Sequence, residues 1–200
     1  MRRFSRNLVV ILLLAVLAGA AIALLASGDP IYTLKEWINW PGYHRYDALI
    51  NDIAVKNKLD PMLLKAVIWR ESSFDPKMTG GEGERGLMQV SEAAAADWAK
   101  AQKIPPPDPA GLFDPATNIN IGAWYLKSRM QNYSDRDDPT PFGLAEYNAG
   151  RTRVNQWLGN DTAAPIGAKQ FIDKIAIPST RKYVDTIEAR YQFYKARGRM

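Results

Sequence analysis

The sequence contains no cysteine and only one histidine, His44. Without cysteine the chain can form no disulfide, carry no lipid on a cysteine and supply no thiolate nucleophile. A single histidine gives too few ligands for a zinc site and no convincing Ser-His or Cys-His nucleophile. A phosphate-binding Gly-Lys motif is absent as well. We therefore expect no metal and no organic cofactor; an oxygen-only Ca²⁺ site is the alternative left open, although no EF-hand spacing is visible.

The net charge is also small outside the first seven residues. The formal net charge is +5, of which Arg2, Arg3 and Arg6 supply three, so the rest of the chain carries about +2. This excess is too small for a nucleic-acid-binding surface, and we expect no nucleic-acid partner. The basic residues between Lys169 and Arg199 are best interpreted as a solvated helix face, with attraction to an anionic surface as the alternative.

A long apolar run follows the three arginines. Residues 8–26 are 19 consecutive apolar or small residues. The run just reaches the length that spans the hydrocarbon of a bilayer and exceeds the core of a typical signal peptide. Cleavage at Ala18-Gly19-Ala20 or Ala21-Ile22-Ala23 is the alternative, but we favour an uncleaved anchor over residues 1–27. The positive-inside rule then places everything after Ser27 outside the cytoplasm.

Residues 28–43 follow the apolar run and are rich in aromatic side chains. Trp37 and Trp40 lie close to the expected membrane surface, where tryptophan is enriched. The segment is therefore either an interfacial linker or a simple tether. We expect residues 44–200 to form one domain, because about 160 residues suffice for a single well-filled core.

Helical signals dominate this domain, and no convincing sheet pattern appears. Several helix starts pair an N-cap acceptor with proline or glutamate in the first turn, and prolines between Ile104 and Pro109 require a loop. The expected helices cover residues 46–58, 60–72, the Ala-rich stretch after Ser91, Asp114 through Met130, the stretch up to Gly150, and residues 180–196. The predicted fold class is mainly α: a single helical domain after the membrane segment, with at most a small β-hairpin around residues 79–90.

One carboxylate falls on an apolar helix face. Leu64, Val67 and Ile68 recur at helical spacing after Asp60-Pro61, and Glu71 continues the same stripe. Desolvation there penalises the charged form, and so does the negative end of the helix dipole. Both effects raise the pKa, and a carboxylic acid still protonated near neutral pH can donate to a leaving glycosidic oxygen. The alternative is a boundary glutamate whose carboxylate reaches water.

Three motifs then appear in order along the chain. The first runs from Glu71-Ser72-Ser73-Phe74-Asp75-Pro76 to Gly86-Leu87-Met88-Gln89. The second is Ala145-Glu146-Tyr147-Asn148-Ala149-Gly150, and the third is Ile177-Pro178-Ser179-Thr180-Arg181-Lys182-Tyr183-Val184. Together they resemble the signature of the lytic transglycosylases over roughly Tyr43 to Tyr194. The resemblance implies a lysozyme-like fold and cleavage of the glycan strands of bacterial peptidoglycan.

The resemblance also implies a set of site residues. Glu71 would be the catalytic acid, Met88 would pack on a sugar ring, and Gln89 would bind the acid or the substrate. Tyr147 and Asn148 would face the acid across the cleft, with the Tyr147 hydroxyl holding the acid in orientation. The substrate-binding residues implied in this way are Ser72, Met88, Gln89, Tyr147, Asn148 and Tyr183.

Three positions depart from the family pattern. Gly80 stands where serine is common, which puts a hydroxyl contact to the substrate's acetamido group in doubt. Glu84 stands where alanine is commoner and adds a carboxylate without an assigned role. Ser179 stands where glutamate is usual, while Tyr183 keeps its place.

The reaction implied by the resemblance uses one carboxylate twice. Glu71 would protonate the oxygen between N-acetylmuramic acid and N-acetylglucosamine, and then, once ionised, accept the proton of the muramyl C6 hydroxyl. The product would be a 1,6-anhydromuramyl end, made without water, on the periplasmic side of the inner membrane.

Two alternatives stay open. A hydrolase resembling goose-type lysozyme would recruit water with Asp75, Glu82 or Glu84 as the base. A non-catalytic wall-binding or secretion-scaffold protein would carry the site without using it.

Overall fold

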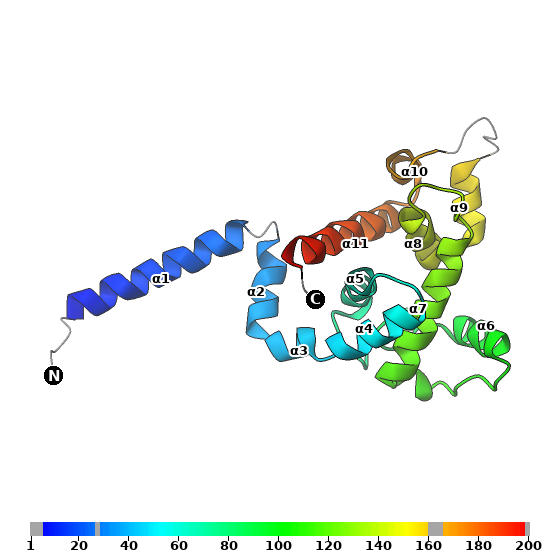
Figure 1. The fold of residues 1–200 in the computed structure, drawn as a ribbon, viewed down its shortest axis with the longest axis horizontal. Coiled ribbons are helices and arrows are strands. Elements are labelled where there is room, and N and C mark those ends of the chain that lie inside the picture. Colours follow the sequence, from blue (N-terminus) through cyan, green and yellow to red (C-terminus); the bar gives the residue numbers. More distant parts are fainter. Residues whose placement is uncertain (1–5, 27–28, 160–165, 199–200) are drawn as a thin grey trace. The chain divides into compact units, whose positions relative to one another are not determined.

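The structure is a computed structural model that describes residues 6–26, 29–159 and 166–198 (Figure 1). Throughout this part of the chain the regular structure is helical. In place of the small hairpin around residues 79–90 there are only two isolated antiparallel bridges, Thr79 with Arg85 and Arg85 with Val90. The predicted mainly α fold class is confirmed.

Contacts between Cα atoms divide the chain into two compact units, with the boundary between Arg45 and Tyr46. The first unit holds α1 (Arg6–Ala26), α2 (Pro30–Ile38) and α3 (Trp40–His44). Within α1, Leu8–Ala26 is long and apolar enough to cross a membrane, a property that signal sequences share. The limits predicted for the anchor, linker and domain remain predictions.

Most of the segment predicted as a linker or tether, residues 28–43, is helical, because α2 and all but the last residue of α3 fall within it. The Asp29 carboxylate accepts a hydrogen bond from the Tyr32 N–H at 2.9 Å, which caps α2 next to Pro30. α2 then packs on α3, because the rings of Tyr32 and Tyr43 meet edge to face at 5.4 Å.

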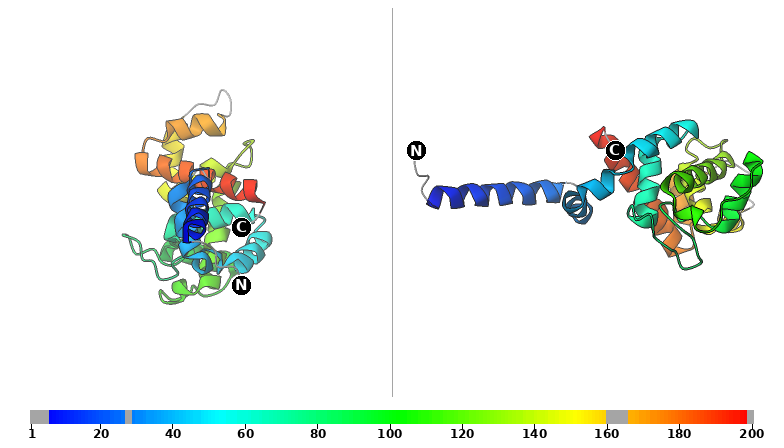
Figure 2. Two further views of the ribbon diagram at one scale, coloured as in Figure 1. Left: turned by 90° about the vertical axis from the view of Figure 1, so that its left-hand side faces the viewer. Right: turned by 90° about the horizontal axis from the view of Figure 1, so that it is seen from below.

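The second unit carries the remaining helices (Figures 1 and 2). α5 packs against α4 and α11, while α8 packs against α7 and α11. The elements are α4 (Asp47–Lys56), α5 (Pro61–Ser72), α6 (Glu92–Gln102), the short 3₁₀ helix η1 (Gly111–Phe113), α7 (Pro115–Gln131), α8 (Thr140–Ala149), α9 (Arg151–Leu158), α10 (Ala168–Lys174) and α11 (Pro178–Arg197).

The three helix starts predicted from capping residues are observed, whereas α4 begins one residue after and α11 two residues before the predicted start. Side chains of Asp60, Ser91 and Asp114 accept hydrogen bonds from first-turn N–H groups at 2.8, 3.1 and 2.8 Å, respectively. The sequence did not predict α9 and α10. Both are short, and each contributes a single buried side chain, Val154 and Phe171, so neither has a periodic apolar face.

α5 lies in the core of the second unit. Leu64, Val67 and Ile68 are fully buried, as their spacing predicts. Lys65 on the same helix is also fully buried, and its ammonium pairs with the Asp47 carboxylate of α4 at 2.6 Å. This packing fixes the C-terminal end of α5, where Glu71 lies.

Candidate active site

Glu71 lies in the last turn of α5 and is half-buried. Its Oε1 accepts a hydrogen bond of 2.6 Å from the hydroxyl of Tyr183, which belongs to α11. The two residues are 112 positions apart, and the packing of α11 on α5 brings them together. A carboxyl group held this way keeps one oxygen oriented by the phenol and leaves the other for a ligand.

The surroundings of Glu71 raise its pKa from 4.5 to about 7. Burial is the largest cause, because it penalises the charged carboxylate. The Tyr183 hydroxyl and the Arg70 guanidinium act in the opposite direction, and the Glu84 carboxylate adds a smaller upward contribution. The side chain is therefore a carboxylic acid that changes protonation state near neutral pH, in the direction that its place on the apolar stripe predicts.

The chain reverses directly after Glu71. Ser73 and Phe74 take left-handed backbone conformations, with φ of 50° and 66°, which ends α5 and starts the loop to Val90. Ser72 is buried, and its hydroxyl donates to the carbonyls of Leu87 at 2.8 Å and Ile68 at 3.2 Å. Ser72, predicted to bind substrate, thus ties the loop to the helix that carries the acid.

Asn118 of α7 holds the far end of this loop and was missed by the sequence reasoning. Its side-chain oxygen accepts from the Met88 N–H at 2.8 Å, and its amide donates to the carbonyls of Arg85 and Leu112, both at 2.7 Å. Gly86 is needed here because its φ is 76° and a Cβ would collide with the Asn118 amide.

Met88 is fully buried. Its side chain lies against Gly122 of α7, where an added Cβ would be 2.6 Å from the Met88 sulfur. Because the Met88 side chain fills the core, it is not placed to make the sugar contact that the resemblance implied. The backbone of Met88 contributes to the site instead, because its carbonyl accepts a hydrogen bond of 2.8 Å from the Tyr147 hydroxyl.

Tyr147 is close to the acid but does not orient it. The Glu71 charge is one of the causes that raise the Tyr147 pKa, after burial. The Tyr147 hydroxyl, however, is the donor to Met88, and its ring meets Tyr125 edge to face at 5.5 Å. The structure therefore gives the orienting bond that was expected of Tyr147 to Tyr183.

Gln89 and Asn148 are the remaining predicted contacts. Gln89 has a φ of 47°, and its Nε2 donates to the carbonyls of Gly86 at 2.9 Å and Met78 at 3.2 Å, so this amide supports the loop. Asn148 is exposed, and its side-chain oxygen accepts from the Thr180 hydroxyl at 2.8 Å. That bond joins the second sequence motif to the third.

Glu146 of the second motif positions α8 rather than the substrate. Its buried carboxylate accepts from the Tyr133 hydroxyl at 2.6 Å and the Asn132 amide at 3.0 Å, and pairs with Arg129 at 3.3 Å. These bonds join α8 to the end of α7 and thereby fix the position of Tyr147.

The departures at Gly80 and Glu84 belong together. A Cβ at Gly80 would collide with the Glu84 carboxylate and lie 2.7 Å from the Gln89 side-chain oxygen. The Glu84 Oε2 also accepts from the Glu82 N–H at 3.1 Å. The carboxylate of Glu84 thus takes the space beside Gly80 that a serine side chain would need.

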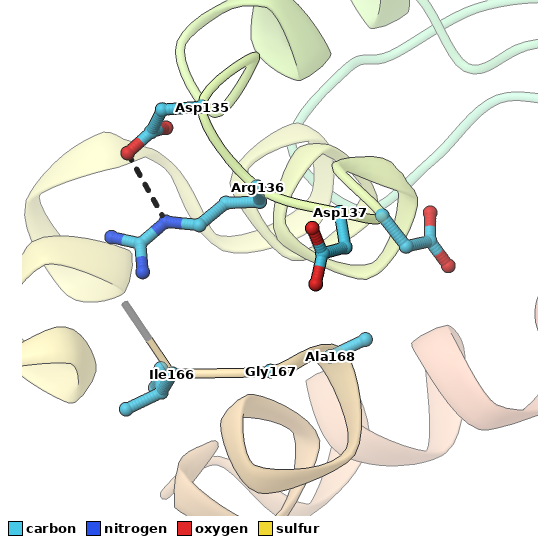
Figure 3. Close-up of a pocket in the computed structure, with 7 residues that line it drawn as sticks. Asp135, Arg136, Asp137, Ile166, Gly167 and Ala168 are labelled. Carbon is cyan, nitrogen blue, oxygen red and sulfur yellow. Dashed lines mark ion pairs between the residues drawn. The ribbon is translucent and has the colours of Figure 1, made fainter. Parts of the chain in front are cut away.

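A separate hollow of about 360 Å³ lies between the loop after α7 and the start of α10 (Figure 3). It is lined by Asp135, Arg136, Asp137, Asp138 and residues 166–168. Arg136 is turned toward Asp135, with the ion pair at 3.5 Å. None of the predicted site residues lines this hollow, so it is distinct from the Glu71 site.

Comparison with known proteins agrees with this geometry. The family model described as transglycosylase SLT domain matches residues 48–169, which is more than half of the chain. The chain belongs to this family. The matched range includes Glu71, the loop to Gln89 and the second motif, whereas Tyr183 lies beyond its end.

Two curated members are similar in sequence. The soluble lytic murein transglycosylase of Escherichia coli K12 is 38% identical over 131 residues, 65% of this chain and 20% of that protein. The membrane-bound lytic murein transglycosylase C of Shigella sonnei is 35% identical over 124 residues, 59% of this chain and 34% of that protein. The chain therefore spans between a fifth and about a third of the length of these relatives.

A solved structure shows that the family fold extends past the matched range. The 70 kDa soluble lytic transglycosylase of E. coli superimposes with a TM-score of 0.70 at 29% identity, covering 90% of this chain and 30% of that one. The resemblance to this family predicted a lysozyme-like fold, and the structural similarity confirms that prediction.

Proposed function

We propose that this chain is a lytic transglycosylase that cleaves the β-1,4 bond between N-acetylmuramic acid and N-acetylglucosamine in peptidoglycan. The observation that carries the proposal is Glu71, a half-buried carboxyl group with a pKa of about 7 in a chain of this family. A group half-protonated near neutral pH can act as a general acid and, after giving up its proton, as a general base. The named activities of the relatives support the same reaction.

In the proposed reaction the Glu71 proton goes to the glycosidic oxygen as its bond to the muramyl C1 breaks. The muramyl acetamido oxygen stabilises the positive charge that develops at C1. The C6 hydroxyl of the same sugar then bonds to C1, and its proton goes to Glu71. The acid is restored, no water is consumed, and the product carries a 1,6-anhydro ring.

The other site residues have supporting roles in this proposal. Tyr183 keeps one carboxyl oxygen of Glu71 fixed, so that the other faces the scissile bond. The loop bounded by Ser72 and Gln89 is held by buried and part-buried hydrogen bonds, and it forms a rigid side of the site next to the acid. Asn148 is exposed next to Tyr147 and offers an amide N–H to substrate, because its oxygen is already used by Thr180.

A hydrolase is the second candidate, and one observation favours it. The Glu84 carboxylate is near enough to raise the pKa of Glu71, so a second acidic group stands close to the acid. Glycosidases with two carboxylates use the second as a base for water or as a nucleophile. We place the transglycosylase first because its mechanism needs only Glu71, and the relatives carry that name.

Mass spectrometry of digested sacculi separates the two candidates. The proposed enzyme releases products with 1,6-anhydromuramyl ends, and Glu71→Gln should release none while still binding the wall, because the amide keeps the shape but has no acidic proton. Products heavier by one water would establish the hydrolase. Turnover by Glu71→Gln within about tenfold of wild type would place the acid elsewhere, since a positioned acid contributes roughly 10²–10⁴-fold.

We further propose that α1 is an uncleaved anchor and that the catalytic unit works on the periplasmic side of the inner membrane. The apolar helix Leu8–Ala26 and the membrane-bound relative support this location. Protein isolated from cells should remain in the membrane fraction through a high-salt wash and keep its arginine-rich start. N-terminal sequences that begin between Ala21 and Ser27 would show a cleaved signal instead.

A further inference from the structure

One face of α2 is apolar and exposed. Ile31, Leu34, Trp37 and Ile38 have exposed fractions between 46% and 77%. With 100° between successive residues, these four side chains share one arc of roughly 120° on the helix. A contiguous apolar face of this kind marks an interaction surface.

The polar groups of α2 are turned away from that arc. Glu36 lies on the opposite side, where its carboxylate meets the His44 ring of α3 at 3.2 Å. The Asp29 carboxylate is used as the helix cap. Lys35 is exposed beside Ile31 at the edge of the arc, where a long cationic side chain can reach phosphate groups. The face is thus apolar with a basic edge and without an acidic one, which suits a phospholipid surface.

Chain connectivity restricts where this face can be. α1 ends at Ala26 and α2 begins at Pro30, so three residues, or four Cα-to-Cα steps, separate the two helix ends. At about 3.3–3.6 Å per residue, that connection spans no more than about 14 Å. If α1 crosses the hydrocarbon layer, the first turn of α2 stays within reach of the headgroup region, which is roughly 5–8 Å deep on each side.

The tryptophans of this segment suit the same location. Tryptophan is enriched at the boundary between headgroups and acyl chains. Trp37 belongs to the apolar arc of α2. Trp40 follows in α3, where one face of its ring stacks on His44 at 3.7 Å and the side chain remains 45% exposed.

We propose that α2 lies in the plane of the bilayer surface, with Ile31, Leu34, Trp37 and Ile38 inserted between the headgroups and the upper acyl chains of the phospholipids. The inference rests on the anchor role proposed for α1. The catalytic unit begins at Tyr46, two residues after α3, so docking of α2 would hold it beside the membrane and restrict it to glycan strands close to that surface.

Single-cysteine labelling tests this placement in the full chain, because the sequence has no cysteine of its own. Leu34→Cys and Ile38→Cys probe the apolar arc, Leu14→Cys probes the middle of α1, and Gln102→Cys is an exposed control on α6. Each variant carries an environment-sensitive fluorophore and is reconstituted into vesicles of phosphatidylethanolamine and phosphatidylglycerol. The vesicles contain lipids spin-labelled either near the headgroup or at mid-chain, which quench fluorophores at those depths.

We expect the probes at Leu34 and Ile38 to be blue-shifted and quenched mainly by the shallow spin label. The probe at Leu14 should be quenched mainly by the mid-chain label, and the probe at Gln102 by neither. Quenching at Leu14 with solvent-exposed, unquenched probes at Leu34 and Ile38 would refute the docking of α2 and leave the anchor intact. Blue-shifted but unquenched probes at Leu34 and Ile38 would also overturn the proposal, because protein would then cover the face. Absence of quenching at Leu14 would refute the anchor, and the docking of α2 with it.

Discussion

The raised pKa of Glu71 has a consequence for stability that the activity assay does not measure. The folded chain holds the Glu71 proton up to about pH 7, whereas the unfolded chain releases it near 4.5. Between these values the folded state binds more protons than the unfolded state, so the free energy of unfolding falls as the pH rises. A carboxyl group with this raised pKa therefore destabilises the folded chain above neutral pH.

Glu71→Gln should remove this cost. The amide cannot ionise, and its carbonyl oxygen can still accept the Tyr183 hydroxyl. The pKa difference from 4.5 to about 7, at 1.36 kcal/mol per pH unit, sets an upper limit of about 3 kcal/mol on the gain. For a chain of this size that limit corresponds to roughly 6–12 °C in melting temperature.

Thermal unfolding of the detergent-solubilised protein between pH 4 and pH 9 measures the effect. Wild type and Glu71→Gln should melt together at pH 4, separate as the pH rises from 4.5 to 7, and stay separated above pH 8. Glu82→Gln is the matched control, because Glu82 is an exposed carboxylate on the neighbouring loop and should give no pH-dependent gain. A melting difference that does not change with pH would refute the assignment of the raised pKa to Glu71.

Three further predictions concern the groups around the acid. Tyr183→Phe removes a hydrogen bond that lowers the pKa of Glu71, so the basic limb of the pH–rate profile should move to higher pH while turnover falls about ten- to a thousandfold; an unchanged profile would exclude the contact. Glu84→Gln removes a charge that raises the same pKa, so the limb should move to lower pH in the same assay. Asn118→Leu leaves the buried Met88 N–H and the Leu112 carbonyl without their side-chain partner, while the Arg85 carbonyl keeps its bond from the Val90 N–H. The substitution should lower the unfolding free energy in urea by about 2 kcal/mol or more, at roughly 1–3 kcal/mol per group.

Features that depend on neighbouring residues could be predicted from the sequence. The helix caps at Asp60, Ser91 and Asp114 need only one residue and the N–H groups that follow it. The apolar stripe of α5 needs only helical periodicity, and it predicted both the buried residues and the raised pKa of Glu71.

The partner of the acid could not be predicted in this way. Tyr147 and Tyr183 both stand in motifs that the sequence suggested, and both carry a hydroxyl. Which hydroxyl reaches Glu71 depends on how α11 packs on α5 and on α8, and Tyr183 is 112 residues away from Glu71 in the sequence. Met88 is a similar case, because a methionine in a motif can face a ligand or the core, and only the contact with Gly122 decides.

The sequence around Asn118 contains a pattern from which its role could have been predicted. With Gly122 and Leu126 it forms a row at spacing of four along α7, and all three are buried. An amide on such a row needs buried partners, because an unpaired one is costly. A polar residue on an apolar stripe drew attention at Glu71, and the same reasoning at Asn118 would have predicted the residue that holds the loop.

The proposed reaction explains why opposing contributions meet at Glu71. A general acid alone would be favoured by burial without compensation, and a general base alone by hydrogen bonds and positive charge that stabilise the carboxylate. Here burial raises the pKa, while the Tyr183 hydroxyl and Arg70 lower it, and the result is about 7. A group that must give a proton and then accept one works best when its pKa is close to the ambient pH. Changes that move this pKa far in either direction should therefore slow one half of the reaction, so the balance between burial and the hydroxyl matters more than either contribution alone.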